Sequence, residues 1–262
     1  VKDKFLNTDS IDEIFKICNE NKIKCIVNNN YSKSLKNSED KLVLSHDLEL
    51  NGILSITAND LSNYCIVEIN EGNLSGHGEI RGDMSIHTGS SGEWGNCVQL
   101  IKGSVKGIKV TEAWGDGIYI YNADNALVEN VEVYNCRRNG ISVISGENVK
   151  INECYIHDIK TTILGASIDI EPNEGKSVKN VFIENLKEHN NTYSILVANA
   201  LSMNVFANNC ELLSTLRVIG TLYINQSKIN EIYSAGFLQM SNCEISDVTN
   251  LQSGSSEIVN CN

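Results

Sequence analysis

Short stretches with apolar residues at alternate positions recur along the chain, and each is followed by a polar turn. The repeated phrase contains two aliphatic or aromatic positions, then two polar residues and a cysteine or small substitute. Its copies lie at residues 131–136, 149–154, 181–186 and 205–210, with weaker copies at 222–227, 238–243 and 257–261. The copies are 18, 32, 24 and 17 residues apart when they are aligned on Val133, Ile151, Ile183, Ala207 and Ile224. Repeats of about 20 residues built from short strands are typical of a solenoid.

Each repeat carries too little apolar surface to fold alone, so the repeats must stack on one another. Period-two alternation indicates strands, and successive stacked strands predict an all-β parallel β-helix. One turn position is asparagine in five copies, at Asn135, Asn185, Asn209, Asn242 and Asn260. Asparagine tolerates the left-handed backbone conformation that bends a strand, so we expect these residues to form one column of corners.

Five of the nine cysteines follow this corner directly, at Cys136, Cys154, Cys210, Cys243 and Cys261. Free cysteine packs as a small hydrophobic residue, and an odd number of cysteines does not suit a complete disulfide framework. We therefore expect a buried ladder of free thiols. Neither a Cys-x-x-Cys pair nor zinc-type histidine spacing occurs, so the sequence predicts no metal and no cofactor; calcium between acids of neighbouring coils has no supporting pattern.

Residues 8–22 carry the clearest helical pattern. Asp9 or Ser10 can serve as the N-cap, and apolar residues recur at helical spacing at Ile11, Ile14, Phe15 and Cys18. A helix with one apolar face is suited to cover the open end of a solenoid. We expect residues 1–75 to form this cap and irregular first coils, and residues 76–262 to form the regular β-helix coils of the same continuous domain.

Composition restricts the partners of the chain. Its net charge is −12 with a pI of about 4.9, which disfavours nucleic acid because phosphate binding requires clustered Lys and Arg. No apolar run approaches the ~20 residues of a membrane span, so we expect no membrane insertion. No signal peptide is visible, and the abrupt ends suggest a fragment of a longer chain.

Three central phrases, at residues 115–121, 138–144 and 165–171, define the face of greatest interest. They align on Ile118, Ile141 and Ile168, and strand alternation turns the residues between inward isoleucines toward the outside. The two resulting outer columns read Tyr119, Ser142, Asp169 and Tyr121, Ile144, Glu171.

Three acids are candidate catalytic groups. Asp169 and Glu171 stand two positions apart on one outer face, which separates their attachment points by about 6.6 Å. Carboxyl groups about 6.5–9.5 Å apart leave room for a water and suit inverting glycoside hydrolysis. The alternative is two solvated surface acids. Asp116, flanked by glycines, is either an active-site carboxylate or a turn residue that binds local amides.

Basic and aromatic residues complete the candidate site. Arg138 and its neighbour Arg137 can hold a sugar carboxylate or pair with acids such as Asp116. His157 can supply proton transfer, although a lone histidine is more often a turn residue. Flat aromatic faces on which sugar rings stack are offered by Trp94, Tyr119 and Tyr121.

The chain resembles the right-handed, single-stranded parallel β-helices of the pectate-lyase superfamily. The phrases that carry the resemblance to the subset of bacteriophage tailspike depolymerases are Glu93-Trp94-Gly95, Gly115-Asp116-Gly117-Ile118, Arg138-Asn139-Gly140-Ile141-Ser142-Val143 and Ile168-Asp169-Ile170-Glu171-Pro172-Asn173. The resemblance implies substrate contact by Glu93 and Trp94. It covers nearly the whole chain, but this superfamily includes hydrolases, lyases, epimerases and binding proteins.

Polygalacturonase-type hydrolases offer one comparison at the level of residues. Their Asn-Thr-Asp-Gly motif corresponds to Trp114-Gly115-Asp116-Gly117, which implies an active-site role for Asp116. Their second acidic motif would fall near Arg137-Arg138, where this chain has no acid. Lyases and epimerases of the superfamily instead need a cation and a base, roles that Arg138, Tyr119 or His157 could fill.

The resemblance implies a domain that cleaves a bacterial surface polysaccharide by carboxylate-assisted hydrolysis. It also implies a homotrimer on the virion surface or in the extracellular space, made in the cytoplasm without a visible signal peptide. Three alternatives stay open: a lyase or epimerase, a glycan-binding module that does not cleave, and a structural solenoid. The reaction product distinguishes a lyase from a hydrolase, since β-elimination leaves an unsaturated sugar.

Overall fold

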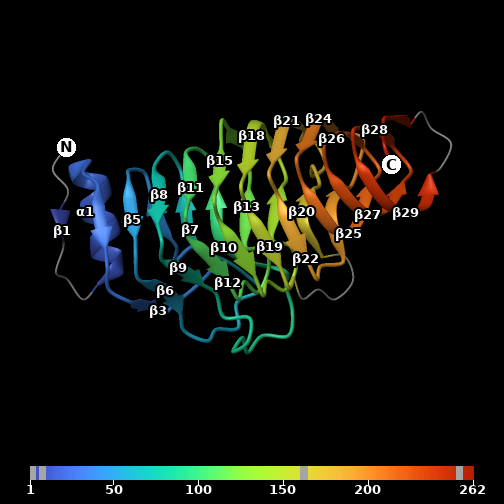
Figure 1. The fold of residues 1–262 in the computed structure, drawn as a ribbon. Coiled ribbons are helices and arrows are strands. Elements are labelled where there is room, and N and C mark those ends of the chain that lie inside the picture. Colours follow the sequence, from blue (N-terminus) through green and yellow to red (C-terminus); the bar gives the residue numbers. More distant parts are fainter. Residues whose placement is uncertain (1–3, 6–9, 160–164, 252–255) are drawn as a thin grey trace.

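A computed structural model describes residues 4–5, 10–159, 165–251 and 256–262, which form one elongated stack of parallel strands. Figure 1 shows the strands running across the long axis of the stack, with colours that follow the sequence from one end to the other. Parallel strands from successive turns of the chain pair edge to edge, and this pairing confirms the predicted β-helix.

The strands lie on three faces. The first face consists of β1 (Lys4–Phe5), β2 (Cys25–Val27), β5 (Leu48–Leu50), β8 (Asn73–Gly76), β11 (Ser104–Lys106), β14 (Ala123–Asp124), β15 (Leu127–Glu129), β18 (Gly146–Asn152), β21 (Val178–Glu184), β24 (Ser202–Asn208), β26 (Thr221–Asn225), β28 (Phe237–Ser241) and β30 (Glu257–Val259). The second face consists of β3 (Tyr31–Lys33), β6 (Ile53–Ile56), β9 (Glu79–Arg81), β12 (Lys109–Thr111), β16 (Glu132–Tyr134), β19 (Tyr155–His157) and β22 (Lys187–His189).

The third face carries the candidate site. Its strands are β4 (Leu42–Leu44), β7 (Asn63–Ile69), β10 (Trp94–Leu100), β13 (Ile118–Ile120), β17 (Ile141–Val143), β20 (Ala166–Ile170) and β23 (Tyr193–Val197). Three longer strands continue from the second face onto the third: β25 (Glu211–Val218), β27 (Lys228–Ser234) and β29 (Glu244–Leu251).

The corner between the first and second faces is a single residue in the left-handed conformation. Its φ angle lies between 51° and 55° in Asn130, Glu153, Asn185, Asn209, Gln226, Asn242 and Asn260. One residue with positive φ bends the chain from one face to the next without a loop, and asparagine adopts this conformation at low cost. The predicted asparagine corner is therefore confirmed at four of its five positions.

The fifth position, Asn135, was assigned to the wrong corner. Ile151 pairs with Val128 rather than with Val133, and Val133 pairs with Ile156 on the second face. Asn135, with φ 53°, therefore belongs to the corner after the second face. The two corners need the same sequence, a left-handed residue followed by an inward residue, so the phrase could not distinguish them.

Cys136 does not belong to the predicted thiol column, because it follows Asn135 at the corner after the second face. The other four cysteines of the ladder follow the first corner, as predicted. All nine cysteines are free, and eight of them are buried, with Cys261 half-buried. The core between the faces is aliphatic: Ile118, Ile141 and Ile168 stack in register and are inaccessible to solvent.

The helix α1 (Ile11–Asn21) lies at the N-terminal end of the stack, as Figure 1 shows. The side chain of Ser10 accepts a hydrogen bond from the backbone N–H of Glu13, which identifies Ser10 as the N-cap. The helix buries the predicted apolar face and continues into β2. The parallel ladder β5–β8–β11 runs without interruption past residue 76, the boundary expected between irregular and regular coils.

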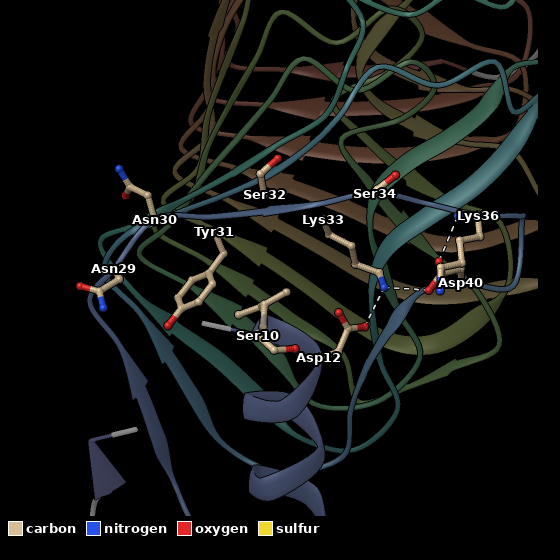
Figure 2. A pocket seen from close by; sticks show the side chains of 11 residues that line it. Ser10, Asp12, Asn29, Asn30, Tyr31, Ser32, Lys33, Ser34, Lys36 and Asp40 are labelled. Carbon is tan, nitrogen blue, oxygen red and sulfur yellow. Dashed lines mark hydrogen bonds and ion pairs between the residues drawn. The ribbon is translucent and has the colours of Figure 1, made fainter. Parts of the chain in front are cut away.

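A pocket of about 510 Å³ lies beside the N-terminus of α1 (Figure 2). Three of its charged side chains pair with one another, because Lys33 Nζ lies 2.7 Å from both Asp12 Oδ1 and Asp40 Oδ1. Among the residues that the structure describes, no helix has the length and apolar character needed to cross a membrane.

Candidate active site

The predicted outer column on the third face is present. Tyr119 pairs in register with Ser142, and Ser142 pairs with Asp169, on the adjacent strands β13, β17 and β20. The flanking Ile168 and Ile170 are fully buried in the core, so alternation directs Asp169 to the outer side of the sheet. Asp169 is nevertheless only 3% exposed, because neighbouring side chains cover it.

Two turns place polar residues beside this column. Asp116 precedes β13 and Asn139 precedes β17, and each is followed by a glycine and an isoleucine. A Cβ atom on Gly117 would lie 2.7 Å from the backbone oxygen of Gly140, so only glycine fits there. The close approach of these two turns brings Asp116 and Asn139 together.

Asp116 is fully buried. Its backbone N–H donates to Asn96 Oδ1 at 3.0 Å, and its Oδ1 accepts a hydrogen bond from the backbone N–H of Asn139 at 3.2 Å. The side-chain amide of Asn139 donates to Asp169 Oδ2 at 3.1 Å. Within the described part of the chain, Asp116 Oδ2 and Asp169 Oδ1 are buried and have no hydrogen-bond partner. Each carboxyl group therefore has one oxygen without a hydrogen bond, enclosed by neighbouring side chains.

Arg138 lies among acidic side chains. Its guanidinium nitrogens are 3.8 Å from Asp116 Oδ2, 3.6 Å from Glu171 Oε2 and 4.0 Å from Glu93 Oε2. Asp116 is buried, whereas the side chains of Glu171 and Glu93 are 46% and 58% exposed. The structure thus brings Asp116, Arg138, Asp169 and Glu171 together, the convergence that a catalytic interpretation requires.

Burial raises the pKa of both aspartates, to different extents. It raises the pKa of Asp116 to about 6, where Arg138 opposes the shift. It raises the pKa of Asp169 to about 8, and the negative charges of Glu171 and Asp116 raise it further while Arg138 and the Asn139 hydrogen bond oppose this. At neutral pH, Asp116 is mainly ionised and Asp169 mainly protonated.

Aromatic side chains lie beside the acids. The rings of Tyr119 and Tyr121 stack with centroids 6.1 Å apart, and Lys176 Nζ lies 5.2 Å from the centre of the Tyr121 ring. Both tyrosines are half-buried, and Trp94 at the start of β10 is 51% exposed. Tyr119 lies two strands from Asp169 in the same outer column of the third face.

Arg137 occupies a different environment from Arg138. Its guanidinium lies 4.0 Å from the centre of the Trp114 ring, and its Nη1 donates to the backbone oxygens of Gly92 and Trp114 at 3.0 and 3.3 Å. These contacts hold the loop that carries Glu93 against the third face. A positioning role in the protein therefore accounts for Arg137, which the sequence suggested as a substrate contact.

His157 lies on the second face, away from Asp116 and Asp169. Its ring nitrogens contact Asp158 Oδ2 at 2.8 Å and Glu132 Oε1 at 3.3 Å. Strand β19, which carries His157, and strand β20, which carries Asp169, belong to different faces of the same coil. The structure therefore does not place His157 among the candidate catalytic groups.

The sequence did not single out Asn139 or Asn96, although both bind the buried acids. A signal for Asn139 was present, because alignment on Ile118 and Ile141 puts Asn139 at the position of Asp116 one coil earlier. No comparable signal marks Asn96, since its contact with the Asp116 backbone depends on how two coils stack.

The fold is similar to that of several known structures. The tailspike protein gp49 from Acinetobacter baumannii bacteriophage Fri1, a capsular polysaccharide depolymerase, shares a TM-score of 0.60 and 14% sequence identity. The likeness covers 100% of this chain and 55% of that protein, so the chain spans about half the length of the tailspike. No curated protein sequence matches the chain.

Two carbohydrate-cleaving enzymes show a more distant likeness of fold. The catalytic unit of an α-1,3-glucanase from Streptomyces thermodiastaticus has a TM-score of 0.47 at 11% identity, covering 92% of this chain and 63% of that one. Endopolygalacturonase I from Stereum purpureum has a TM-score of 0.41 at 14% identity, covering 98% and 96%.

A family model described as "right handed beta helix region" matches residues 49–212 and again residues 94–262. These matches include every strand of the candidate site. Because they extend over well more than half of the sequence, the chain belongs to the right-handed β-helix family.

Proposed function

We propose that this chain is the polysaccharide-cleaving domain of a tailspike-like depolymerase and hydrolyses a bacterial surface glycan. Asp169 acts as the general acid and Asp116 as the general base or nucleophile. The similarity in fold to a capsular polysaccharide depolymerase supports the substrate class. The reaction is inferred from the residues of this chain, since one fold hosts many activities.

The observation that carries the proposal is that Asn139 holds two buried carboxyl groups, those of Asp116 and Asp169, beside each other. Glycoside hydrolysis requires one protonated and one ionised carboxyl group at the same pH. Burial raises the pKa of Asp169 to about 8 and that of Asp116 to about 6, so both forms coexist near pH 7. Asp169 Oδ1 has no hydrogen-bond partner among the described residues, and Asp116 Oδ2 has only the ion pair with Arg138 at 3.8 Å.

The protonated Asp169 donates its proton to the glycosidic oxygen as the bond to the leaving sugar breaks. The Asp116 carboxylate either removes a proton from the attacking water or attacks the sugar carbon itself. Positive charge develops on the sugar in this transition state, and the ionised Asp116 stabilises it. Tyr119 and Tyr121 support sugar rings along the outer side of β13.

The same contacts disfavour a lyase that uses Arg138 as the base. Burial lowers the pKa of Arg138, but the acidic groups around it, Asp116 first, outweigh burial and raise the pKa above its ordinary value. A guanidinium held by three carboxylates does not release its proton. Arg138 instead keeps Asp116 ionised.

A glycan-binding module that does not cleave is the second candidate. The stacked Tyr119 and Tyr121 favour it, because aromatic rings on an outer face suit sugar binding with or without catalysis. In such a module the buried acids would serve only the fold, and replacing them by amides would leave glycan affinity intact.

The test compares the purified chain with its Asp169→Asn and Asp116→Asn variants on a panel of bacterial capsular polysaccharides. Asp124→Asn, an exposed acid on the first face, is the matched control. We expect new reducing ends without unsaturated sugar, a rate loss of about 10²–10⁴ in either site variant, and no change in the control. Unsaturated products would indicate a lyase. Binding without cleavage by the unaltered chain would overturn the proposal.

Further parts of the proposal concern assembly and location. We propose that the protein acts as a homotrimer on the virion surface or outside the cell. Exposed apolar side chains on the later coils support a partner there; they include Leu201, Leu213 and Val248. Leu196, in strand β23 before these coils, is buried within its own chain and offers no such surface. Light scattering after size exclusion tests the trimer directly.

A further inference from the structure

A ladder of stacked rings runs along the outer side of the second face. Tyr134, His157 and His189 pair in register on the adjacent strands β16, β19 and β22. The His157 ring lies 5.0 Å from the Tyr134 ring and 5.1 Å from the His189 ring, with interplanar angles of 5° and 8°. The candidate active site lies on the third face and uses none of these residues.

We propose that His157, Asp158 and His189 form a binding site for a divalent transition-metal ion. One ligand atom from each of the three residues lies within 4.8 Å of the other two. His157 Nδ1 and Asp158 Oδ2 are 2.8 Å apart. Metal–ligand bonds of roughly 2.0–2.2 Å place neighbouring ligand atoms about 3 Å apart, so His157 and Asp158 are spaced as two ligands of one ion. The His189 ring stacks on the His157 ring at an interplanar angle of 8° and must rotate for its lone pair to point at the same ion.

The second nitrogen of His157 has the partner that a metal-binding histidine requires. Glu132 Oε1 lies 3.3 Å from His157 Nε2, and Lys109 Nζ holds the other carboxylate oxygen of Glu132 at 2.7 Å. Glu132 can accept the Nε2–H when an ion takes the place of the proton that Nδ1 shares with Asp158, and the Nδ1 lone pair would then point at the ion. Nδ1 is the atom that faces Asp158.

The other two ligands are also held in place. Asp158 stands at a corner with φ 53°, and Asn190, the corner residue of the next coil, donates a hydrogen bond to its Oδ1. The hydroxyl of Tyr155 lies 3.1 Å from His189 Nδ1 and orients that ring. All three ligand residues are partly exposed, so an ion can reach them from solvent.

The donor set indicates the class of ion. Two imidazoles and one carboxylate suit zinc, copper, nickel or ferrous iron, whereas calcium and magnesium prefer sites made wholly of oxygen. Because His157 and His189 belong to successive coils, a bound ion would join β19 to β22. Metal bound only by the folded protein stabilises it by mass action.

The test uses the full chain, free of any polyhistidine tag, stripped with a chelator and titrated with zinc chloride by calorimetry. The His157→Asn/His189→Asn double variant is compared with His77→Asn, which removes an exposed histidine elsewhere. We expect one zinc ion per chain in the unaltered protein and in the control. We expect at least a hundredfold weaker binding in the double variant. At a hundredfold excess over Kd, zinc should raise Tm by about 5 °C only where the site is intact.

Cobalt substitution separates this site from the nine cysteines. Cobalt held by nitrogen and oxygen ligands gives weak visible bands, whereas thiolate ligation adds intense near-ultraviolet absorption. Zinc binding that persists in the double variant, or thiolate absorption with cobalt, would overturn the proposal. None of these readouts depends on glycan cleavage, so failure of the metal site and failure of the proposed hydrolase remain distinguishable.

Discussion

The side-chain amide of Asn139 donates to Asp169 Oδ2 at 3.1 Å, and this contact joins two coils at the outer side of the third face. The backbone N–H of the same asparagine donates to Asp116 Oδ1 at 3.2 Å. Its Oδ1 accepts a hydrogen bond from the backbone N–H of Ala166 at 3.0 Å. One residue therefore fixes the relative positions of the two proposed catalytic carboxyl groups, and through Ala166 it also fixes the start of β20.

Replacing Asn139 by alanine should lower glycan cleavage by about 10²-fold, because misplaced catalytic groups react slowly. The variant also removes a hydrogen bond that lowers the pKa of Asp169, so the alkaline limb of the pH–rate profile should move to higher pH. A merely structural role would not move that limb. The matched control is Asn73→Ala, which removes side-chain hydrogen bonds to Asp47 and Ser104 on the first face. An unchanged pH profile in Asn139→Ala would contradict the positioning role.

The pH dependence of the unaltered chain should be bell-shaped. Activity requires ionised Asp116, whose pKa is raised to about 6, and protonated Asp169, whose pKa is raised to about 8. The value of kcat/KM should therefore rise through about pH 6, reach its maximum near pH 7 and fall through about pH 8. Initial rates of reducing-end formation at constant ionic strength measure it. A profile that stays flat from pH 5 to 9 would exclude this acid–base pair.

Arg138→Gln should shift both limbs of the pH profile of kcat/KM to higher pH. The guanidinium opposes the upward pKa shifts of Asp116 and Asp169, so its removal raises both values further. Arg137→Gln is the matched control, because Arg137 lies over the Trp114 ring and contacts backbone oxygens instead of the acids. Equal shifts in both arginine variants would indicate a change of fold instead of a local electrostatic effect.

Asp169→Asn should stabilise the protein in a pH-dependent way. The pKa of Asp169 is raised in the folded state, so its contribution to stability is fully present below pH ~4, where unfolded aspartate is also protonated. That contribution is lost as the pH rises through about 8. Between pH 4 and 8, the free energy of unfolding of the variant should therefore rise relative to that of the unaltered chain, by an amount on the order of 3–5 kcal/mol from linkage. Thermal unfolding at several pH values measures the difference, with Asp124→Asn as control; a pH-independent difference would contradict burial of a raised-pKa acid.

Sequence periodicity was sufficient for the fold and for one outer column. Alternation around Ile118, Ile141 and Ile168 predicted that Tyr119, Ser142 and Asp169 would share a face, because inward aliphatic residues leave their neighbours only the outer side. The same periodicity could not place His157. Each coil of the β-helix crosses three faces, and alternation along a strand does not indicate which of these faces the strand occupies.

The burial of the two aspartates could not be predicted from the sequence, because it depends on contacts between coils. An outward position on a strand suggests a solvated side chain. Asp169 points outward from the sheet, but its side chain is buried. Asn139 of the preceding coil donates to Asp169 Oδ2, and the buried Leu196 of the next coil pairs beside Asp169. The local pattern also misassigned Cys136, since the corners on either side of the second face both use a left-handed residue followed by an inward one.

The thiols provide a test of the coil assignment that requires no substrate. Eight cysteines are buried, and burial raises the pKa of Cys154 to about 12 and of Cys210 to about 11, so these thiols neither ionise nor meet a reagent in the folded chain. Cys261 is half-buried in the last coil.

Ellman's reagent at pH 8 should therefore modify about one thiol quickly in the native protein and nine after unfolding. Cys261→Ser should abolish the fast phase, whereas Cys243→Ser, which removes a buried thiol one coil earlier, should leave it intact. Rapid modification of several thiols in the native protein would mean that the corner columns do not face the core.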